Sequence, residues 1–314
     1  MRLAWWKKDA APKAREVEDF DEEGSLDGES TLELSQVGPY EVIAPIGAGG
    51  MGTVYKAIDR SRDQTVAIKV LHSRFDMDKR RRKRDYLGRE ILIAASLQHP
   101  CIIRMSKEII EQEDSSGNIR RCLLMEYIDG YNLRKLINDH TLDLRQKIDV
   151  CIRLCEGLDF LHQHQIVHRD IKPENFLFSR DMSQAKIVDF GVSKSTATWR
   201  TRWVKEGGGT RRYMSPEQLA KKNVDARSDI FSFGLTMYEL LTGRHPCNGR
   251  DAKEVLMQIR SSKYKFQPPS KYEPSIPSHL DRIVLKALRR NPERRYQSVT
   301  EMLMDLTRLR ESRL

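Results

Sequence analysis

The sequence predicts an α+β fold made of two segregated lobes. Short strand-like runs fill residues 40–127, and beyond Gly130 the pattern is mainly helical. Strands first and helices afterwards favour this class over a sheet with alternating helices. The 314 residues suit one large domain or two lobes that share a cleft, and the 39% of hydrophobic residues can form a sizeable core.

Each expected element follows from its local pattern. Alternation and β-branched residues predict strands at 40–43, 52–58, 65–71, 102–111 and 120–127. The turn-forming stretch 114–118 separates the last two. Residues 78–98 are charged but place apolar side chains near helical spacing, which predicts an amphipathic helix. The same spacing predicts further helices at 141–163, 227–242, 251–260, 277–289 and 297–311.

The charge divides the chain into an acidic N-terminal segment and a basic remainder. Residues 1–39 carry five basic and ten acidic side chains, whereas the whole chain has a net charge of +10. Residues 1–38 are expected to form a mostly disordered tail, and residues 312–314 a short C-terminal one. The acidic tail is a candidate to bind a partner or to fold against the basic run 80–84. A solvated surface explains the positive charge of the remainder, so we expect no nucleic-acid partner.

Composition argues against several other classes of protein. The longest mostly apolar stretch, 230–241, is too short to span a bilayer, and residues 1–8 lack the apolar core of a secretory signal. The five cysteines form no C-x-x-C unit, which argues against a disulfide framework or a zinc site. We therefore expect a cytoplasmic protein without a transmembrane segment.

The first motif with chemical meaning is G-A-G-G-M-G at residues 47–52. Glycines let backbone amides approach phosphate oxygens closely because no Cβ intervenes. A dinucleotide-binding loop has the same G-x-G-x-x-G spacing but opens a helix, whereas residues 54–57 continue as a strand. The sequence contains no G-x-x-x-x-G-K-[ST], so a P-loop is excluded.

A lysine inside an apolar strand is the second motif. Lys69 ends the run Val66-Ala-Ile-Lys69, and burying its ammonium group is costly unless a carboxylate or a phosphate meets it. Glu90, in the expected helix 78–98, is the natural partner. Because the strand follows the glycine-rich hairpin, we expect Lys69 to bind phosphate.

Two further motifs, H-R-D-I-K-P-E-N at 168–175 and D-F-G at 189–191, gather polar residues. Asp170, Asn175 and Asp189 present side-chain oxygens, which Mg²⁺ accepts together with nucleotide phosphates. A single Asp or Asn is usually a turn residue. Turn formation alone does not explain why Asp170, Asn175 and Asp189 all occur, in this order, after the glycine-rich loop and Lys69.

From about residue 40 to residue 311 the chain resembles the eukaryotic-type protein kinase domain, and its motifs look most like those of bacterial serine/threonine kinases. The resemblance implies a small β-rich N-lobe at 39–127, a hinge at about 126–130 and a helical C-lobe at 131–311, with an ATP cleft between the lobes. It also implies transfer of the ATP γ-phosphate to serine or threonine hydroxyls of protein substrates.

The resemblance assigns roles to individual residues. Asp170 would orient the substrate hydroxyl and accept its proton, Lys172 would steady the γ-phosphate, and Lys69 held by Glu90 would contact the other phosphates. Asn175 and Asp189 would hold Mg²⁺, or Mn²⁺ in its place. The residues implied to surround the nucleotide are Gly47, Ala48, Gly49, Gly50, Gly52, Val54, Ala67, Met125, Glu126, Ile128 and Leu177.

Regulation is expected in the activation segment, residues 189–217. Lys172 and Thr210 match the serine/threonine pattern rather than that of tyrosine kinases. Arg169 and Lys194 resemble a pocket for a phosphorylated activation segment, and Glu206 stands where many relatives carry the phosphothreonine. The candidate autophosphorylation sites are Ser195, Thr196, Thr198 and Thr201.

Two structural contacts and two alternative functions complete the expectations. Glu217 should pair with Arg295, and Asp229 should hold the backbone of the catalytic loop. A nucleotide-binding pseudokinase or scaffold is the main alternative, and a small-molecule kinase is the second. The first is disfavoured because the residues needed for transfer are all present, and the second because the full activation segment is present.

Overall fold

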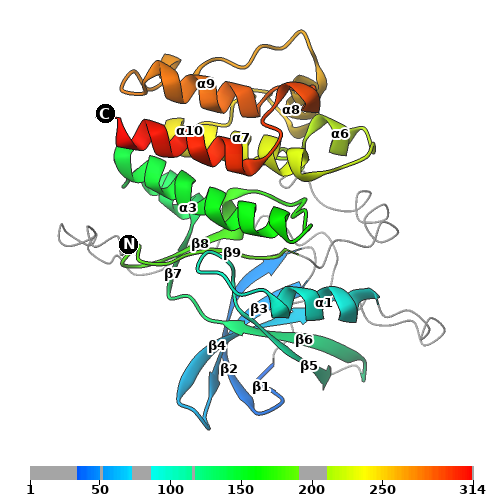
Figure 1. Cartoon of the computed structure of the whole chain (residues 1–314). Coiled ribbons are helices and arrows are strands. Elements are labelled where there is room, and N and C mark those ends of the chain that lie inside the picture. The colour runs from blue at the N-terminus through cyan, green and yellow to red at the C-terminus, as the bar shows by residue number, and fades with distance from the viewer. Residues whose placement is uncertain (1–33, 50–51, 73–85, 115–116, 191–210, 313–314) are drawn as a thin grey trace. The chain divides into compact units, whose positions relative to one another are not determined.

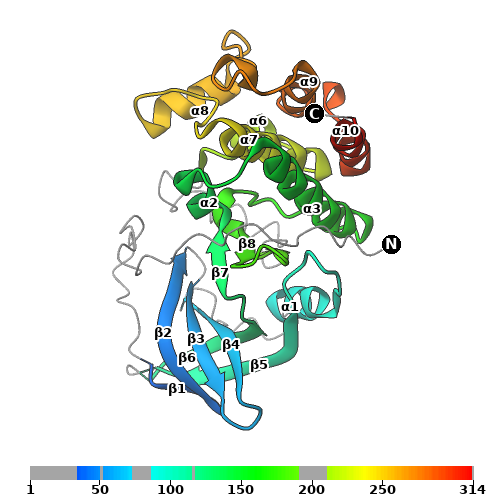
Figure 2. The ribbon, with the colours of Figure 1, turned by 90° about the vertical axis from the view of Figure 1, so that its left-hand side faces the viewer.

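The computed structural model describes residues 34–49, 52–72, 86–114, 117–190 and 211–312, with side chains omitted for residues 86–90 (Figure 1). The chain divides into two compact units. The N-terminal unit comprises Met1–Gln98 and Ile103–Asp129, and the C-terminal unit comprises His99–Ile102 and Gly130–Leu314. Strands dominate the first unit and helices the second, as the sequence predicts (Figures 1 and 2).

One antiparallel sheet forms the body of the N-terminal unit. Its six strands lie in the order β1-β2-β3-β4-β6-β5. They are β1 (Gln36–Val37), β2 (Tyr40–Gly49), β3 (Gly52–Asp59), β4 (Gln64–Leu71), β5 (Met105–Glu113) and β6 (Ile119–Glu126). From Val66 onward every residue of the central strand β4 is buried, so both of its faces are covered. A core that includes Tyr55, Ile68 and Cys122 lies on one face of the sheet.

The sheet begins earlier than the predicted start of the globular region at residue 39. Gln36 pairs with Glu41 and Val37 pairs with Tyr40, which adds β1 to the sheet. The Val37 side chain is fully buried in the core. A two-residue strand carries no periodic signal, and for this reason the sequence pattern placed these residues in the tail.

The helix predicted at 78–98 is confirmed within the described residues as α1 (Tyr86–Ser96), and residues 73–85 lie outside them. Ile91, Ala94 and Ala95 are buried, whereas Leu92 and Ile93 are about half exposed. The buried positions have helical spacing, so one face of α1 packs inward and contacts β5.

The C-terminal unit combines a small antiparallel sheet with a helical bundle. The sheet has the order β7-β8-β9, with β7 (Gly130–Asn132), β8 (Phe176–Ser179) and β9 (Ala185–Ile187). The described α-helices are α2 (Leu133–Asp139), α3 (Leu144–Gln163), α6 (Pro216–Leu219), α7 (Ala226–Thr242), α8 (Ala252–Arg260), α9 (Ser278–Ala287) and α10 (Val299–Glu311). Three short 3₁₀ helices are η3 (Pro173–Asn175), η4 (Pro269–Lys271) and η5 (Pro292–Arg294).

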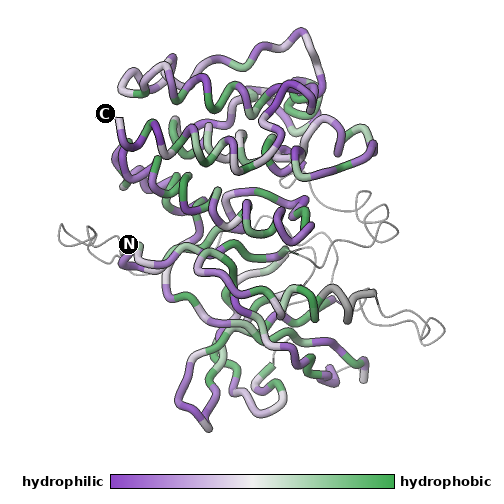
Figure 3. The backbone as a smooth tube through the Cα atoms, viewed as in Figure 1, coloured by the Kyte–Doolittle hydropathy of each residue, from purple (hydrophilic) through white to green (hydrophobic). Residues whose placement is uncertain are grey.

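Helix α7 is the centre of this unit. Residues 228–241 are all buried. Figure 3, coloured by hydropathy, shows hydrophobic and hydrophilic stretches alternating along the helices of this unit. The helix contacts α3, α9 and α10. A helix that is buried on every side needs neighbours all round it, and its buried polar side chains, among them Asp229 and Glu239, need partners there.

Local capping explains where four of the five predicted C-terminal helices begin. The side chains of Asp143, Asp225, Asp251 and Ser298 accept backbone N–H groups at the first turns of α3, α7, α8 and α10. Because a cap precedes the helix, these helices start up to three residues from their predicted bounds. No described helix has the length and apolar character needed to span a membrane.

Candidate active site

The predicted catalytic loop, residues 168–175, is attached to the buried helix α7 through one carboxylate. Asp229, 1% exposed, accepts the backbone N–H of His168 at 2.7 Å and that of Arg169 at 2.8 Å. Its Oδ2 also lies 2.8 Å from Nε2 of His162 on α3. The prediction that Asp229 holds this backbone is therefore confirmed. Two amides bonded to one carboxylate fix the course of the chain just before Asp170.

A strained residue precedes Asp170. Arg169 has a φ of 68°, in the left-handed region that costs an ordinary residue about 1–3 kcal/mol. It is held on both sides, because its N–H donates to Asp229 and its carbonyl accepts Nε2 of Gln218 at 2.9 Å. Gln218 in α6 is 1% exposed, and its Oε1 accepts the N–H of Ser215 at 2.9 Å. Helices α6 and α7 thus position the loop together.

Three of the predicted catalytic and metal-binding side chains meet inside the loop. Nδ2 of Asn175 donates to the Asp170 carbonyl at 2.7 Å and to its Oδ2 at 3.1 Å. Nζ of Lys172 lies 3.5 Å from the same Oδ2. Both partners of the Asn175 amide group are acceptors, so its nitrogen must face them, and its oxygen is the atom suited to a cation.

The hairpin of β8 and β9 brings the second predicted metal ligand to the same place. Asn175 immediately precedes β8, and its carbonyl accepts the N–H of Val188, the residue after β9, at 3.0 Å. Asp189 follows directly, with a left-handed φ of 62°. Buried His168 joins the two segments, because its Nε2 lies 2.9 Å from the Val188 carbonyl and its Nδ1 accepts the N–H of Asp170 at 3.3 Å.

In the N-terminal unit, the described glycines of the 47–52 motif divide into two kinds. A Cβ on Gly52 would lie 2.0 Å from the Val70 carbonyl oxygen, so packing within the sheet requires glycine there. A Cβ on Gly47 or Gly49 would meet no atom within 4 Å. Packing within the described chain therefore does not explain these two glycines, whereas close approach of a ligand does. Gly50 lies outside the described residues.

The predicted phosphate lysine and adenine residues lie on the neighbouring strands. Lys69 on β4 is only 4% exposed, and it pairs in register with Val54 on β3. Ala67, two positions earlier on β4, is also buried. Glu90 lies within α1, but its side chain is outside the described part, so the Lys69–Glu90 pair stays a prediction.

The predicted hinge begins at the end of β6. Met125 is buried and pairs in register with Ala67. The N–H of Glu126 donates to the Arg104 carbonyl at 3.0 Å, and its side chain accepts the Arg104 N–H at 2.8 Å. Ile128 follows outside any strand, near the end of the N-terminal unit. Leu177, expected on the opposite face of adenine, lies on β8 of the C-terminal unit.

A polar cluster beside the catalytic loop was not predicted from the sequence. Arg134 on α2 donates through Nε to Glu174 at 2.9 Å and through Nη1 to Glu239 on α7 at 2.8 Å. The hydroxyl of Tyr213 contacts both Arg134 and Glu239. Burial alone would raise the pKa of Glu239, but the bonds from Arg134 and Tyr213 outweigh it and lower that pKa. The cluster links the catalytic loop to the segment before α6.

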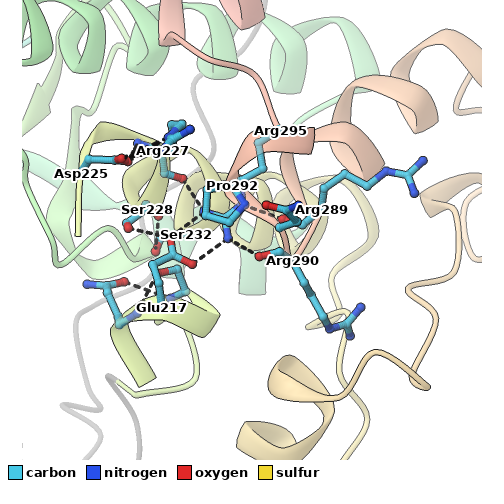
Figure 4. A network of polar contacts seen from close by, with 12 residues as sticks. Glu217, Asp225, Arg227, Ser228, Ser232, Arg289, Arg290, Pro292 and Arg295 are labelled. Carbon is cyan, nitrogen blue, oxygen red and sulfur yellow. Dashed lines mark hydrogen bonds and ion pairs between the residues drawn. The ribbon is translucent and has the colours of Figure 1, made fainter. Parts of the chain in front are cut away.

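The predicted pair of Glu217 and Arg295 is confirmed as a buried, two-pronged ion pair (Figure 4). The two N–O distances are 2.6 and 2.7 Å, and Arg295 also donates to the carbonyls of Arg227, Arg289 and Arg290. Burial alone would raise the pKa of Glu217, but the bonds from Arg295 hold it below its usual value. This contact braces α6 against the segment before α10.

Most predicted regulatory residues lie outside the described part of the chain. Arg169 is described, whereas residues 191–210 are not. The roles proposed for Lys194, Thr198, Thr201, Glu206 and Thr210 therefore stay predictions.

Comparison with known proteins identifies the family. The protein kinase domain family matches residues 40–305. The serine/threonine-protein kinase PknB of Mycolicibacterium smegmatis is 37% identical over 278 residues, which cover 87% of this chain and 43% of that protein. PknB of Mycobacterium leprae is 39% identical over 278 residues, covering 86% of this chain and 43% of that protein. The chain therefore spans less than half the length of these curated relatives.

A solved structure agrees with the sequence comparison. The kinase domain of Mycobacterium tuberculosis PknI superimposes with a TM-score of 0.62 at 25% identity, covering 87% of this chain and 97% of that one. The fold, the catalytic loop and the family match agree with one another. The chain belongs to the protein kinase domain family.

Proposed function

We propose that this chain is a serine/threonine protein kinase that transfers the γ-phosphoryl group of ATP to protein hydroxyls. The observation that carries the proposal is the catalytic loop, in which Lys172 and Asn175 both contact the Asp170 carboxylate on a backbone fixed by Asp229. Phosphoryl transfer depends mainly on positioning and charge neutralisation, and a rigid loop of this composition supplies both.

Asp170 is suited to hold the acceptor hydroxyl and take up its proton. Its Oδ2 already accepts the Asn175 amide group and lies near the Lys172 ammonium group. These two contacts hold the Asp170 carboxylate in one orientation. Lys172 lies close enough to stabilise negative charge that develops on the transferred phosphoryl group.

The donor set fits Mg²⁺ or Mn²⁺ held jointly with a nucleotide. Asn175 and Asp189 supply an amide oxygen and a carboxylate from adjoining ends of one hairpin. In the described part of the chain, no three His, Cys, Asp or Glu side chains form a metal site, so nucleotide phosphate oxygens and water would complete the shell. When bound, the ion would neutralise phosphate charge.

Residues of the N-terminal unit would bind the nucleotide. Gly47 and Gly49 leave open space for phosphate oxygens, and buried Lys69 supplies a positive charge. We assign the adenine contacts to the Glu126 carbonyl and the Ile128 backbone, because the N–H of Glu126 already donates to Arg104.

The test maps the acceptor residues. The full chain is incubated with γ-labelled ATP and Mg²⁺, alone and with a generic basic protein, and labelled sites are identified by mass spectrometry. We expect label on serine and threonine, including Thr198 or Thr201 in the chain itself, and none on tyrosine. ATP binding without any label would favour the pseudokinase or scaffold, whose partners would include one for residues 1–38.

A further inference from the structure

Two neighbouring arginines stand beside the catalytic loop with incomplete hydrogen bonding. Arg211 and Arg212 directly precede Tyr213 and are partly buried. In each, Nε is enclosed, and within the described part of the chain it has no hydrogen-bond acceptor. The guanidinium group of Arg212 lies over the ring of Tyr213, with its carbon 5.9 Å from the centroid. No carboxylate among the described residues forms an ion pair with either arginine.

This arrangement is unfavourable as it stands. A buried N–H without an acceptor has lost its water and gained nothing in return. Two guanidinium groups on adjacent residues also repel each other. An anion that meets the Nη nitrogens of these groups would offset their positive charge, and guanidinium groups bind carboxylates and phosphates in a two-pronged way.

The carboxylates in the cluster around Tyr213 are already engaged by another arginine. Arg134 bonds Glu174 and Glu239 at 2.9 and 2.8 Å. Burial and the Glu239 carboxylate raise the pKa of Tyr213, and burial lowers the pKa of His245 to about 4, so neither is charged at pH 7. Both carboxylates are therefore taken up by Arg134, while Arg211 and Arg212 add two positive charges directly before Tyr213.

Contacts within the C-terminal unit place the pair close to the proposed base. Tyr213, next to Arg212, contacts Arg134, which bonds Glu174, the neighbour of Asn175 in the catalytic loop. A second route runs from Ser215 through Gln218 to the carbonyl of Arg169. A protein segment that delivers a hydroxyl to Asp170 would thus pass near Arg211 and Arg212.

We propose that Arg211 and Arg212 form a recognition site for a carboxylate or phosphate on the protein substrate, a few residues from the acceptor hydroxyl. The preferred substrates are acidic or already phosphorylated segments. The inference rests on the proposed function, because Asp170 defines where the acceptor lies.

The test compares peptides that share one serine acceptor in an alanine background. Aspartate, phosphoserine or lysine is placed in turn at each position up to about four residues on either side, the reach of a short extended segment. Transfer to the neutral peptide is measured first. For the full chain we expect aspartate or phosphoserine at one or two positions to raise kcat/KM about tenfold, the effect of a charge-assisted hydrogen bond.

Arg211→Ala and Arg212→Ala should abolish this gain while preserving transfer to the neutral peptide. Arg282→Ala removes the same charge from an exposed position on α9 and should leave the preference unchanged. Equal rates on all peptides, or a preference that survives in both variants, would overturn the proposal. A preference for lysine would also overturn it and would point to Glu174.

Two further arms separate this inference from its alternatives. Phosphate on the chain's own activation segment is a second anion source, so the series is repeated after phosphatase treatment. If the two variants then lower transfer to every peptide by the same factor, the arginines do not recognise a carboxylate or phosphate on the substrate. Complete absence of transfer would refute the proposed function instead. In that case fluorescence anisotropy measures the affinity of labelled peptides. The proposal requires that the aspartate peptide binds the chain more tightly than the neutral peptide and that this difference in affinity disappears in both variants.

Discussion

Replacing Asp229 with asparagine isolates the part of the fold that positions the catalytic loop. The two oxygens of Asp229 serve the amides of His168 and Arg169 and the ring of His162. Asparagine keeps only one oxygen. We expect it to take the Oδ2 position, where the His168 N–H and the His162 ring meet. Its NH₂ group then faces the N–H of Arg169, so a bond is replaced by two opposed donors.

The expected magnitude follows from that single lost bond. A hydrogen bond to a charged group contributes about 1.5–3 kcal/mol, and the unsatisfied donor adds to its loss, so we expect Asp229→Asn to lower the free energy of unfolding by about 3 kcal/mol. The left-handed backbone of Arg169 stores about 1–3 kcal/mol, which is released if the loop relaxes. A shift of about 1 Å at Asp170 is expected to lower kcat about 100-fold.

The assay measures kcat, KM for ATP and urea unfolding for the variant beside a matched control. Asp149→Asn removes the buried partner of Arg310, where the ion pair joins α3 to α10 at 2.5 Å, away from the loop. We expect similar losses of stability in both variants, but a large fall in kcat only in Asp229→Asn, with KM for ATP changed less than about twofold. A kcat for Asp229→Asn within about threefold of the Asp149→Asn value would refute the positioning role.

Two other predictions follow from the same structure. Gly47→Ala should leave stability unchanged and raise KM for ATP several-fold, whereas Gly52→Ala should destabilise the sheet because its Cβ would collide with the Val70 carbonyl; equal melting temperatures for both variants would contradict this distinction. Arg295→Met should cost about 3–5 kcal/mol at pH 7, because Glu217 is left buried and charged. In the wild type the lowered pKa of Glu217 means that the pair stabilises fully above the ordinary value of 4.5 and is lost as pH falls through the folded pKa. In Arg295→Met burial should raise that pKa, so the difference in unfolding free energy should shrink between pH 7 and pH 5, and a constant difference would show that Glu217 is not the cause.

Much of the fold could be predicted because its signals are local. The apolar run ending at Leu71 and the helical spacing within 227–242 are periodic over many residues, and both elements form where expected. The contacts of Asp229 and the pair of Glu217 and Arg295 were predicted through the family resemblance and are confirmed.

The other features of the fold and the site depend on contacts between segments, which a local sequence pattern does not predict. Arg134 and Glu239 are 105 positions apart in the sequence. Neither belongs to a recognised motif, so nothing in the sequence pattern pairs them. Strands β7 and β9 have three residues each, too few to show alternation. The open space at Gly47, which separates a ligand-related glycine from a packing-related one, is visible only when neighbouring strands are in place.

The most direct test of the account is the rate at which the chain phosphorylates a serine peptide at saturating Mg²⁺ and ATP, compared with Asp170→Asn and Lys69→Met. We predict that Asp170→Asn loses transfer by a factor of about 1,000 or more while still binding ATP, and that Lys69→Met loses both transfer and ATP affinity. Equal transfer by the wild type and Asp170→Asn would contradict the central claim that this carboxylate organises the reaction.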